Sequence, residues 1–258
     1  MTLTPSMFLI VCPLLFLAGF VDAIGGGGGL ISLPGYLLAG LPMHQAIATN
    51  KLSSCLGTSL ATFRFFKNGL INLKLAIPSV ITAILGSSLG ANLSLRMEEK
   101  VMEYLLFIIL PVAAFIVLNR KLFKDTPDSG AVVLNKRTYL TASIFAFVVG
   151  IYDGFYGPGT GTFLLIAFTV FAKISISSAN AQAKVINLTT NVTSLVIFLL
   201  NGQVLLPLGL AAAACNMAGN YLGSGLAMSK GSKIVRPVIL LVLTLLLLKI
   251  IMSFLGLS

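Results

Sequence analysis

Two lysines stand inside long apolar stretches of this 258-residue chain. Each has polar residues three and seven positions further on: Ser54 and Thr58 after Lys51, and Asn187 and Asn191 after Lys184. This spacing places each set on one face of a helix. An amine among apolar residues is costly unless it faces a cavity or an opposite charge. The two faces therefore indicate an anion or coupling site. The alternative is that each lysine snorkels, or pairs structurally with a nearby aspartate.

Two aspartates, Asp22 and Asp153, each stand just before a glycine-rich run. A carboxylate in this place can couple transport to protons or sodium, or can be the counter-ion of Lys51 or Lys184. It can also hold unwound backbone through side-chain hydrogen bonds. The sequence leaves these three roles open, and none of them requires a cofactor.

The glycine-rich runs, residues 25–29 and 157–161, interrupt segments that otherwise resemble membrane helices. Each glycine in a helix interior costs about 1 kcal/mol relative to alanine, so a run of glycines breaks the helix. In a bilayer, broken backbone is tolerated where protein buries it or where it lines a polar cavity; a loop between two ordinary spans is the alternative. Free amides and the positive end of a following short helix favour an anionic ligand. The residues predicted to bind it here are Gly27, Gly28, Gly29, Gly159, Thr160 and Gly161.

Composition indicates the class of protein. The chain is 57% hydrophobic and 9% charged, and its mean hydropathy is +1.01, values outside the usual range of soluble domains. The net charge of +10 does not indicate nucleic acid, because the basic residues lie in short loops between apolar runs. The isolated cysteines and the single histidine give no disulfide framework and no metal site. We expect a membrane protein that is not an enzyme.

Apolar runs in the first half predict helices over about residues 6–24, 30–41, 43–66, 71–95 and 101–119. The segment over 30–41 is too short to cross a hydrocarbon core of about 30 Å unaided. A linker with proline, glycine and basic residues follows at 120–137. Lys51 stands about eight residues into its helix, roughly 12 Å along it and near the middle of a bilayer.

After the linker the sequence pattern begins again. Several anchors of the two halves correspond: Asp22 with Asp153, Gly28 with Gly159, Lys51 with Lys184, and Gly86 and Gly90 with Gly219 and Gly223. We therefore predict a duplication with a first transmembrane repeat over 1–119, a cytoplasmic linker over 120–137 and a second repeat over 138–258. The glycine pairs are predicted to pack helices together. Asn216 and Asn220, near the second pair, are within reach of the cavity.

The basic residues predict the orientation of the halves. If the linker is cytoplasmic and each half crosses an odd number of times, most of the 17 lysines and arginines face the cytoplasm. Of those in loops, only Arg96, Lys100 and Lys249 then lie outside. We predict an all-α polytopic membrane protein of two homologous halves arranged as inverted repeats. Each half has a glycine-broken helix and about four to five membrane segments, and both termini are periplasmic.

Three stretches resemble the TauE/SafE sulfite exporter family, also called TSUP. They are residues 22–34, the Asn50-Lys51 pair and residues 152–161, and the last is the most specific. The resemblance extends over nearly the whole chain, with one glycine-rich motif opening each half. It implies a carrier in the bacterial inner membrane that exports sulfite or small organosulfonates with energy from an ion gradient.

These observations predict a secondary transporter that carries a small anion, such as sulfite or an organosulfonate, by alternating access at a midplane site between the repeats. Replacing Lys51 or Lys184 by methionine is expected to abolish export without preventing membrane insertion. Protons or sodium are the candidate coupling ions. A passive anion channel fits the same residues, and an intramembrane enzyme is the less favoured alternative. The expected partners are the bilayer and the anion, with a homodimer left open and nucleic acid excluded.

Overall fold

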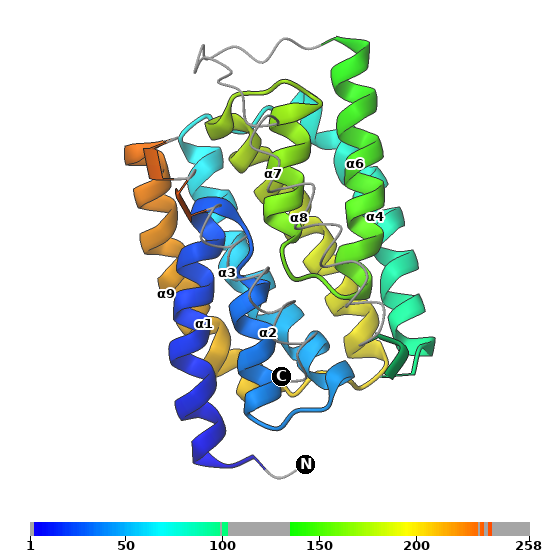
Figure 1. Ribbon diagram of the computed structural model, residues 1–258, viewed down its shortest axis with the longest axis vertical. Helices are drawn as coiled ribbons and strands as arrows, with labels where there is room; N and C mark the ends of the chain where they lie inside the picture. Colours follow the sequence, from blue (N-terminus) through cyan, green and yellow to red (C-terminus); the bar gives the residue numbers. More distant parts are fainter. Residues whose placement is uncertain (1–2, 99, 103–134, 232, 235–236, 239–258) are drawn as a thin grey trace, which may run out of the picture.

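The computed structural model describes the chain except for residues 1–2, 99, 103–134, 232, 235–236 and 239–258. The described part contains helices and no strand, and the long helices lie side by side in one bundle (Figure 1). The helices are α1 (Pro5–Gly25), α2 (Gly29–Leu38), α3 (Met43–Lys67), α4 (Leu73–Arg96), α6 (Lys136–Phe155), α7 (Thr160–Val170), α8 (Ile176–Leu200) and α9 (Leu206–Lys230).

The first four predicted helices agree with the structure to within three residues at each end. The predicted helix over 101–119 lies outside the described residues apart from its first two positions. The predicted linker over 120–137 lies outside them apart from its last three positions, and α6 already begins at Lys136. The predicted number of membrane segments in each half therefore falls partly outside the described chain.

Four described helices, α1, α4, α6 and α8, are long and apolar enough to cross a membrane. The outer surface of the bundle carries exposed large apolar side chains, among them Ile77, Leu140 and Leu200. Such a surface is unfavourable in water and matches the hydrocarbon of a bilayer. The fold is that of a multi-pass membrane protein.

The short helices α2 and α7 fold back along the helices that precede them (Figure 1). A Cβ on Gly28 would meet the backbone of Ala18 in α1, whereas one on Gly35 would meet the side chain of Leu14. Along the shared contact, residue numbers therefore rise in α2 while they fall in α1, so the two helices are antiparallel. In the second half, the rings of Phe145 and Phe171 stack with centroids 4.9 Å apart, which brings the end of α7 to the middle of α6. The short helices therefore turn back at the breaks and do not continue the preceding helix.

Close helix contacts join the first half to the second. The glycines of the two pairs face backbone oxygens of the partner helix: Gly219 that of Phe16, Gly223 that of Phe20, Gly86 that of Phe147 and Gly90 that of Ile151. The prediction that these glycines pack helices is confirmed. Because residue numbers rise together in both contacts, α1 runs parallel to α9, and α4 runs parallel to α6.

Gly90→Ala is expected to destabilise the protein, because its Cβ would overlap the backbone oxygen of Ile151 and force α4 and α6 apart. Overpacking of this kind costs about 1–3 kcal/mol. Gly225→Ala is the matched control, since its nearest neighbour is the flexible Arg64 guanidinium at 3.2 Å. Thermal unfolding in detergent measures both variants. Equal midpoints for Gly90→Ala and Gly225→Ala would contradict the packing assignment.

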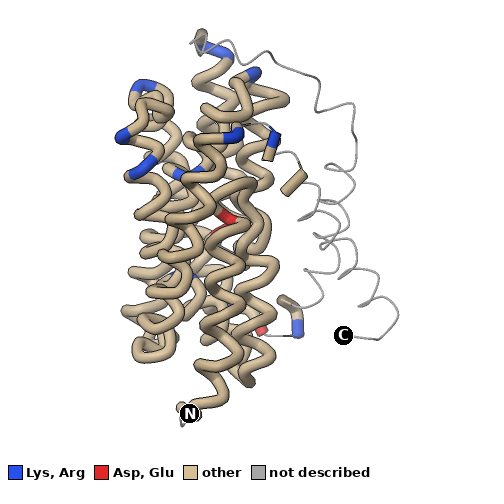
Figure 2. The backbone as a smooth tube through the Cα atoms, turned by 90° about the vertical axis from the view of Figure 1, so that its left-hand side faces the viewer, with Lys and Arg blue, Asp and Glu red and all other residues tan. Residues whose placement is uncertain are grey.

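Basic residues gather at one end of the bundle. Figure 2 shows most of the described lysines and arginines at the end away from the N-terminus. This end includes the turn between α3 and α4, the start of α6 and the last turn of α9. The separation of charge along the bundle axis is the asymmetry that a protein oriented in a membrane displays.

Candidate functional site

The two glycine-rich breaks meet at the centre of the bundle. The hydroxyl of Thr162 donates a hydrogen bond of 3.0 Å to the backbone oxygen of Gly25 in the other half. Gly26 has a φ of +73°, and a Cβ there would overlap the backbone of Gly161. Gly159 has a φ of +88° where α7 begins. Glycine alone combines this backbone conformation with so close an approach, so the glycines allow the two breaks to touch.

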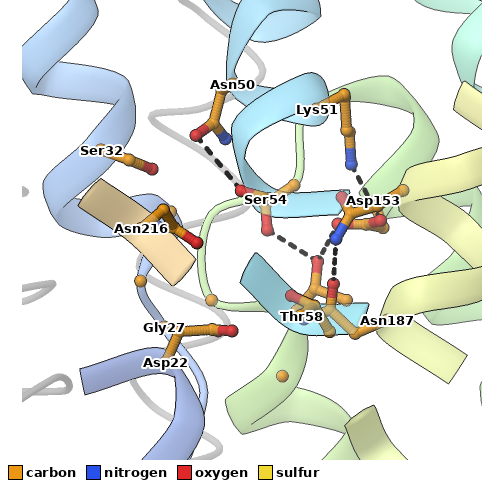
Figure 3. Close-up of a pocket in the computed structure, with 17 residues that line it drawn as sticks. Asp22, Gly27, Ser32, Asn50, Lys51, Ser54, Thr58, Asp153, Asn187 and Asn216 are labelled. Atoms are coloured by element: carbon orange, nitrogen blue, oxygen red, sulfur yellow. Dashed lines mark hydrogen bonds and ion pairs between the residues drawn. The ribbon is translucent and has the colours of Figure 1, made fainter. Parts of the chain in front are cut away.

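A polar cavity lies where the breaks meet α3, α8 and α9 (Figure 3). It is lined by Asp22, Gly27, Gly28, Gly29, Ser32, Asn50, Lys51, Ser54, Thr58, Asp153, Gly157, Gly159, Thr160, Gly161, Asn187, Asn191 and Asn216. The lining includes every residue predicted for the site except Lys184. The structure therefore brings the two polar helix faces, both breaks and both aspartates to one place.

The prediction omitted Ser32, Asn50 and Gly157 from this lining. Asn50 directly precedes Lys51 and Gly157 opens the second break, so a wider window around each motif would have found them. Ser32 is a lone polar residue on the short helix α2, and no sequence signal marks it. Asn216, named as within reach, lines the cavity. Asn220 is not among the lining residues, and its side chain donates a hydrogen bond of 2.9 Å to the amide oxygen of Asn216.

The cavity is narrow. Its volume of about 20 Å³ is enough for one water molecule. An oxyanion with four or more heavy atoms needs more room, so the lining must rearrange before such a ligand binds. The observed arrangement is a compact form of the site.

Both lysines pair with an aspartate of the other half. Lys51 Nζ lies 2.8 Å from Asp153 Oδ2, and Lys184 Nζ lies 2.6 Å from Asp22 Oδ2. The lysine side chains are only 2% and 1% exposed, which rules out the snorkelling alternative. Of the roles left open for the aspartates, that of counter-ion is present in the structure.

The two ion pairs differ in geometry. Lys184 donates a hydrogen bond to Asp22 Oδ2 and does not line the cavity. Lys51 lines the cavity, and Asp153 Oδ2 accepts no aligned hydrogen bond from the described part of the chain although the ammonium is close. Because Lys51 lines the cavity and its ammonium has three N–H donors, it can bind a ligand there as well as Asp153.

Amide and hydroxyl groups line the rest of the cavity. On α8, Asn191 donates a hydrogen bond of 2.6 Å to Asn187 Oδ1. On α3, Ser54 donates one of 3.4 Å to Asn50 Oδ1. On α9, Asn216 donates one of 3.0 Å to the backbone of α1. Such groups can exchange these bonds for bonds to a ligand oxygen, so the site suits a compact anion with several acceptor oxygens.

The family model that matches the chain, over residues 11–250, is described as sulfite exporter TauE/SafE. Similar curated proteins are named probable membrane transporter proteins. One from Sinorhizobium is 35% identical, over 88% of this chain and 85% of its own. One from Haemophilus influenzae is 34% identical, over 88% of this chain and 87% of its own. YfcA from Escherichia coli K12 is 32% identical, over 93% of this chain and 87% of its own. No solved structure gives a significant match.

Proposed function

The chain belongs to the sulfite exporter TauE/SafE family of membrane transporters, and we propose that it carries a small anion through the central cavity. The anion binds the Lys51 ammonium, the backbone amides of the breaks and the surrounding side-chain amides and hydroxyls. The observation that carries the proposal is a lysine only 2% exposed that borders a polar cavity inside the bundle. A buried ammonium is costly, and a functional site is the usual reason for one within a membrane.

We propose that the substrate is a sulfur oxyanion, either sulfite or a small organosulfonate, and that export is the working direction. The description of the matching family model supports this class. The glycine breaks support it as well, because amides at the start of a short helix present a positive end to a group of anionic oxygens.

We further propose that the halves are inverted repeats and that transport occurs by alternating access. The packing of α1 on α9 is matched by that of α4 on α6, and each short helix returns toward the side from which its preceding helix came. Two similar units that meet at one site can rock about it. The narrow cavity supports a carrier over an open channel, because an anion can reach a site this small only when the protein opens it and then closes it again.

The charge asymmetry supports an orientation in the bacterial inner membrane. The end of the bundle that is rich in lysine and arginine is placed in the cytoplasm by the positive-inside rule. The N-terminus, at the opposite end, is then periplasmic. Accessibility of a cysteine introduced at Thr4, after replacement of the native cysteines, to a membrane-impermeant reagent on intact spheroplasts tests this orientation.

Thermal stabilisation by ligands tests the proposed substrate class. We expect sulfite, thiosulfate, methanesulfonate, isethionate or sulfoacetate to raise the unfolding midpoint of the purified protein. A ligand at 100 times its Kd contributes about 2.7 kcal/mol to the native state. Methanesulfonamide is the matched control for methanesulfonate, because it has a similar shape and no charge. If methanesulfonate and methanesulfonamide stabilise the protein equally, or if no sulfur anion stabilises it, the proposed substrate class is ruled out.

A further inference from the structure

We infer that a proton is the second substrate of this transporter and that Asp153 carries it across the membrane in the same direction as the anion, so that export is driven by the outward gradient of the anion itself. This inference rests on the proposed function, because it assigns the coupling ion of the same site. It does not depend on which sulfur anion is carried.

The charges at the site are already balanced. The described buried charges are Lys51 with Asp153 and Lys184 with Asp22, which together are neutral. An anion that binds Lys51 displaces Asp153 and adds one negative charge to a poorly solvated site. Isolated charge in such surroundings is costly and is usually removed by protonation. The exchange is balanced if the Asp153 carboxylate gains one proton to become a carboxylic acid, while the Lys51 ammonium keeps its protons and pairs with the anion.

Thr160 already provides a partner for the protonated form. Its Oγ1 lies 2.7 Å from Asp153 Oδ1 and 2.7 Å from the backbone oxygen of Gly157. The hydroxyl has one hydrogen, so it can donate to only one of these two acceptors. When Asp153 is protonated at Oδ1, it donates to Thr160 and the threonine donates to Gly157. The proton on Oδ1, the Thr160 hydroxyl and the Gly157 oxygen then each have a partner, so the site accommodates both protonation states of Asp153.

The other half lacks this arrangement. The alignment that matches Asp22 with Asp153 and Gly28 with Gly159 places Gly29 opposite Thr160. Asp22 therefore has no hydroxyl at the corresponding position, and it accepts a direct hydrogen bond from Lys184 at 2.6 Å. The two pairs therefore differ: of the two, the Lys51–Asp153 pair has a hydroxyl beside its carboxylate and a lysine that lines the cavity.

The other ionisable groups near Asp153 leave this assignment unchanged. Lys51 faces it from α3 and Thr160 from α7. On its own helix, Tyr152 is close, and its hydroxyl donates a hydrogen bond of 2.6 Å to the backbone oxygen of Pro158. Tyr156, also close to Tyr152, follows at the end of the helix. Asp22 borders the same cavity and is held by Lys184 on α8. Asp153 is thus the carboxylate whose counter-ion a cavity anion can take.

Proteoliposomes clamped at zero membrane potential with valinomycin and potassium provide the test. The probes are [14C]isethionate and [35S]thiosulfate, which are anions of strong acids and bring no proton of their own. We expect wild-type proteoliposomes to accumulate isethionate in the lumen, against its concentration gradient, when the external solution is acidic. A pH dye in the lumen should report one proton entering with each isethionate. Counterflow of labelled isethionate at equal pH measures anion transport separately.

Variants separate coupling from anion transport. In Asp153→Asn, any isethionate that still crosses is expected to move without a proton, so pH-driven accumulation should fall at least tenfold and the proton count per isethionate should fall from one to near zero, whatever counterflow remains. Asp22→Asn is the matched comparison, and it should lower both activities together because its pair is structural. Thr160→Val is expected to alter the pH dependence of accumulation, because the hydroxyl is a hydrogen-bond partner of Asp153 Oδ1 in both protonation states, and Thr160→Ser should restore the wild-type dependence.

The outcomes are distinguishable. If neither probe shows counterflow in wild type, the proposed function fails and the coupling assignment fails with it. If counterflow is present but the pH gradient drives no accumulation and no proton moves, the carrier remains and the proton assignment is overturned. Should Asp153→Asn fail to fold, the proton count of wild type decides the question alone.

Discussion

Lys51→Met is expected to abolish anion binding and transport while the protein still inserts into the membrane. The substitution removes the ammonium that lines the cavity and leaves Asp153, 2% exposed, without its counter-ion. Loss of one partner of a buried pair costs about 3–5 kcal/mol, so the unfolding midpoint should fall as well. Anion affinity should fall about 100-fold or more, which corresponds to about 2.7 kcal/mol. Ligand-induced thermal shifts and flux in proteoliposomes measure the two effects.

A double variant separates the two consequences. Lys51→Met combined with Asp153→Asn removes both charges, so we expect it to recover stability without recovering anion binding. Lys67→Met is the matched control, because Lys67 lies in the last turn of the same helix at the surface of the bundle. Normal binding by the double variant would contradict the assigned role of Lys51.

Gly26→Ala is expected to prevent assembly of the native fold. Its φ of +73° disfavours any side chain, and the new Cβ would overlap the backbone of Gly161 and Thr162 where the two halves touch. Neither backbone can give way without separating the breaks. We expect little monodisperse protein after membrane extraction, and no transport from what remains.

Gly69→Ala isolates the effect of backbone conformation. Gly69 has a similar φ of +69°, but a Cβ there meets nothing within 4 Å, because it lies in the turn between α3 and α4. The control therefore carries the conformational penalty, on the order of 1 kcal/mol, without the collision. Size-exclusion profiles of membrane extracts compare the two variants. Equal yields would show that close contact between the breaks is not essential.

Much of the site could be predicted because its chemistry conflicts with its surroundings. Lys51 and Lys184 are charges in apolar helices, and a run of glycines destabilises any helix. Both features are unfavourable in a membrane helix, so they can be recognised in the sequence. The predicted duplication then linked features far apart in the chain. The structure brings nearly all of them to one cavity.

What could not be predicted depends on packing between the halves. From the sequence, Lys51 and Lys184 are equivalent, because they occupy matching positions in the predicted duplication. Only the three-dimensional arrangement shows that one lines the cavity and that the other is turned to Asp22. In the same way, the length of the apolar segment over 30–41 excluded a full crossing, but contacts such as that between Gly35 and Leu14 were needed to show that α2 folds back.

The role of Asn216 shows a second limit. A small-residue pair such as Gly219 and Gly223 predicts close packing of α9 on another helix, and the structure shows this packing against α1. The side chain of Asn216 reaches the cavity because that packing sets the rotation of α9. Sequence periodicity gives the face of a helix, whereas its rotation relative to a distant helix comes from contacts.

Counterflow of labelled isethionate, measured side by side for wild type and Lys51→Met in proteoliposomes, tests the central claim most directly. A carrier with its anion site at Lys51 predicts that unlabelled isethionate inside accelerates uptake of label by wild type, and that Lys51→Met shows none of this acceleration. Uptake by wild type that unlabelled isethionate does not accelerate would indicate a channel. Undiminished counterflow in Lys51→Met would show that the anion binds elsewhere.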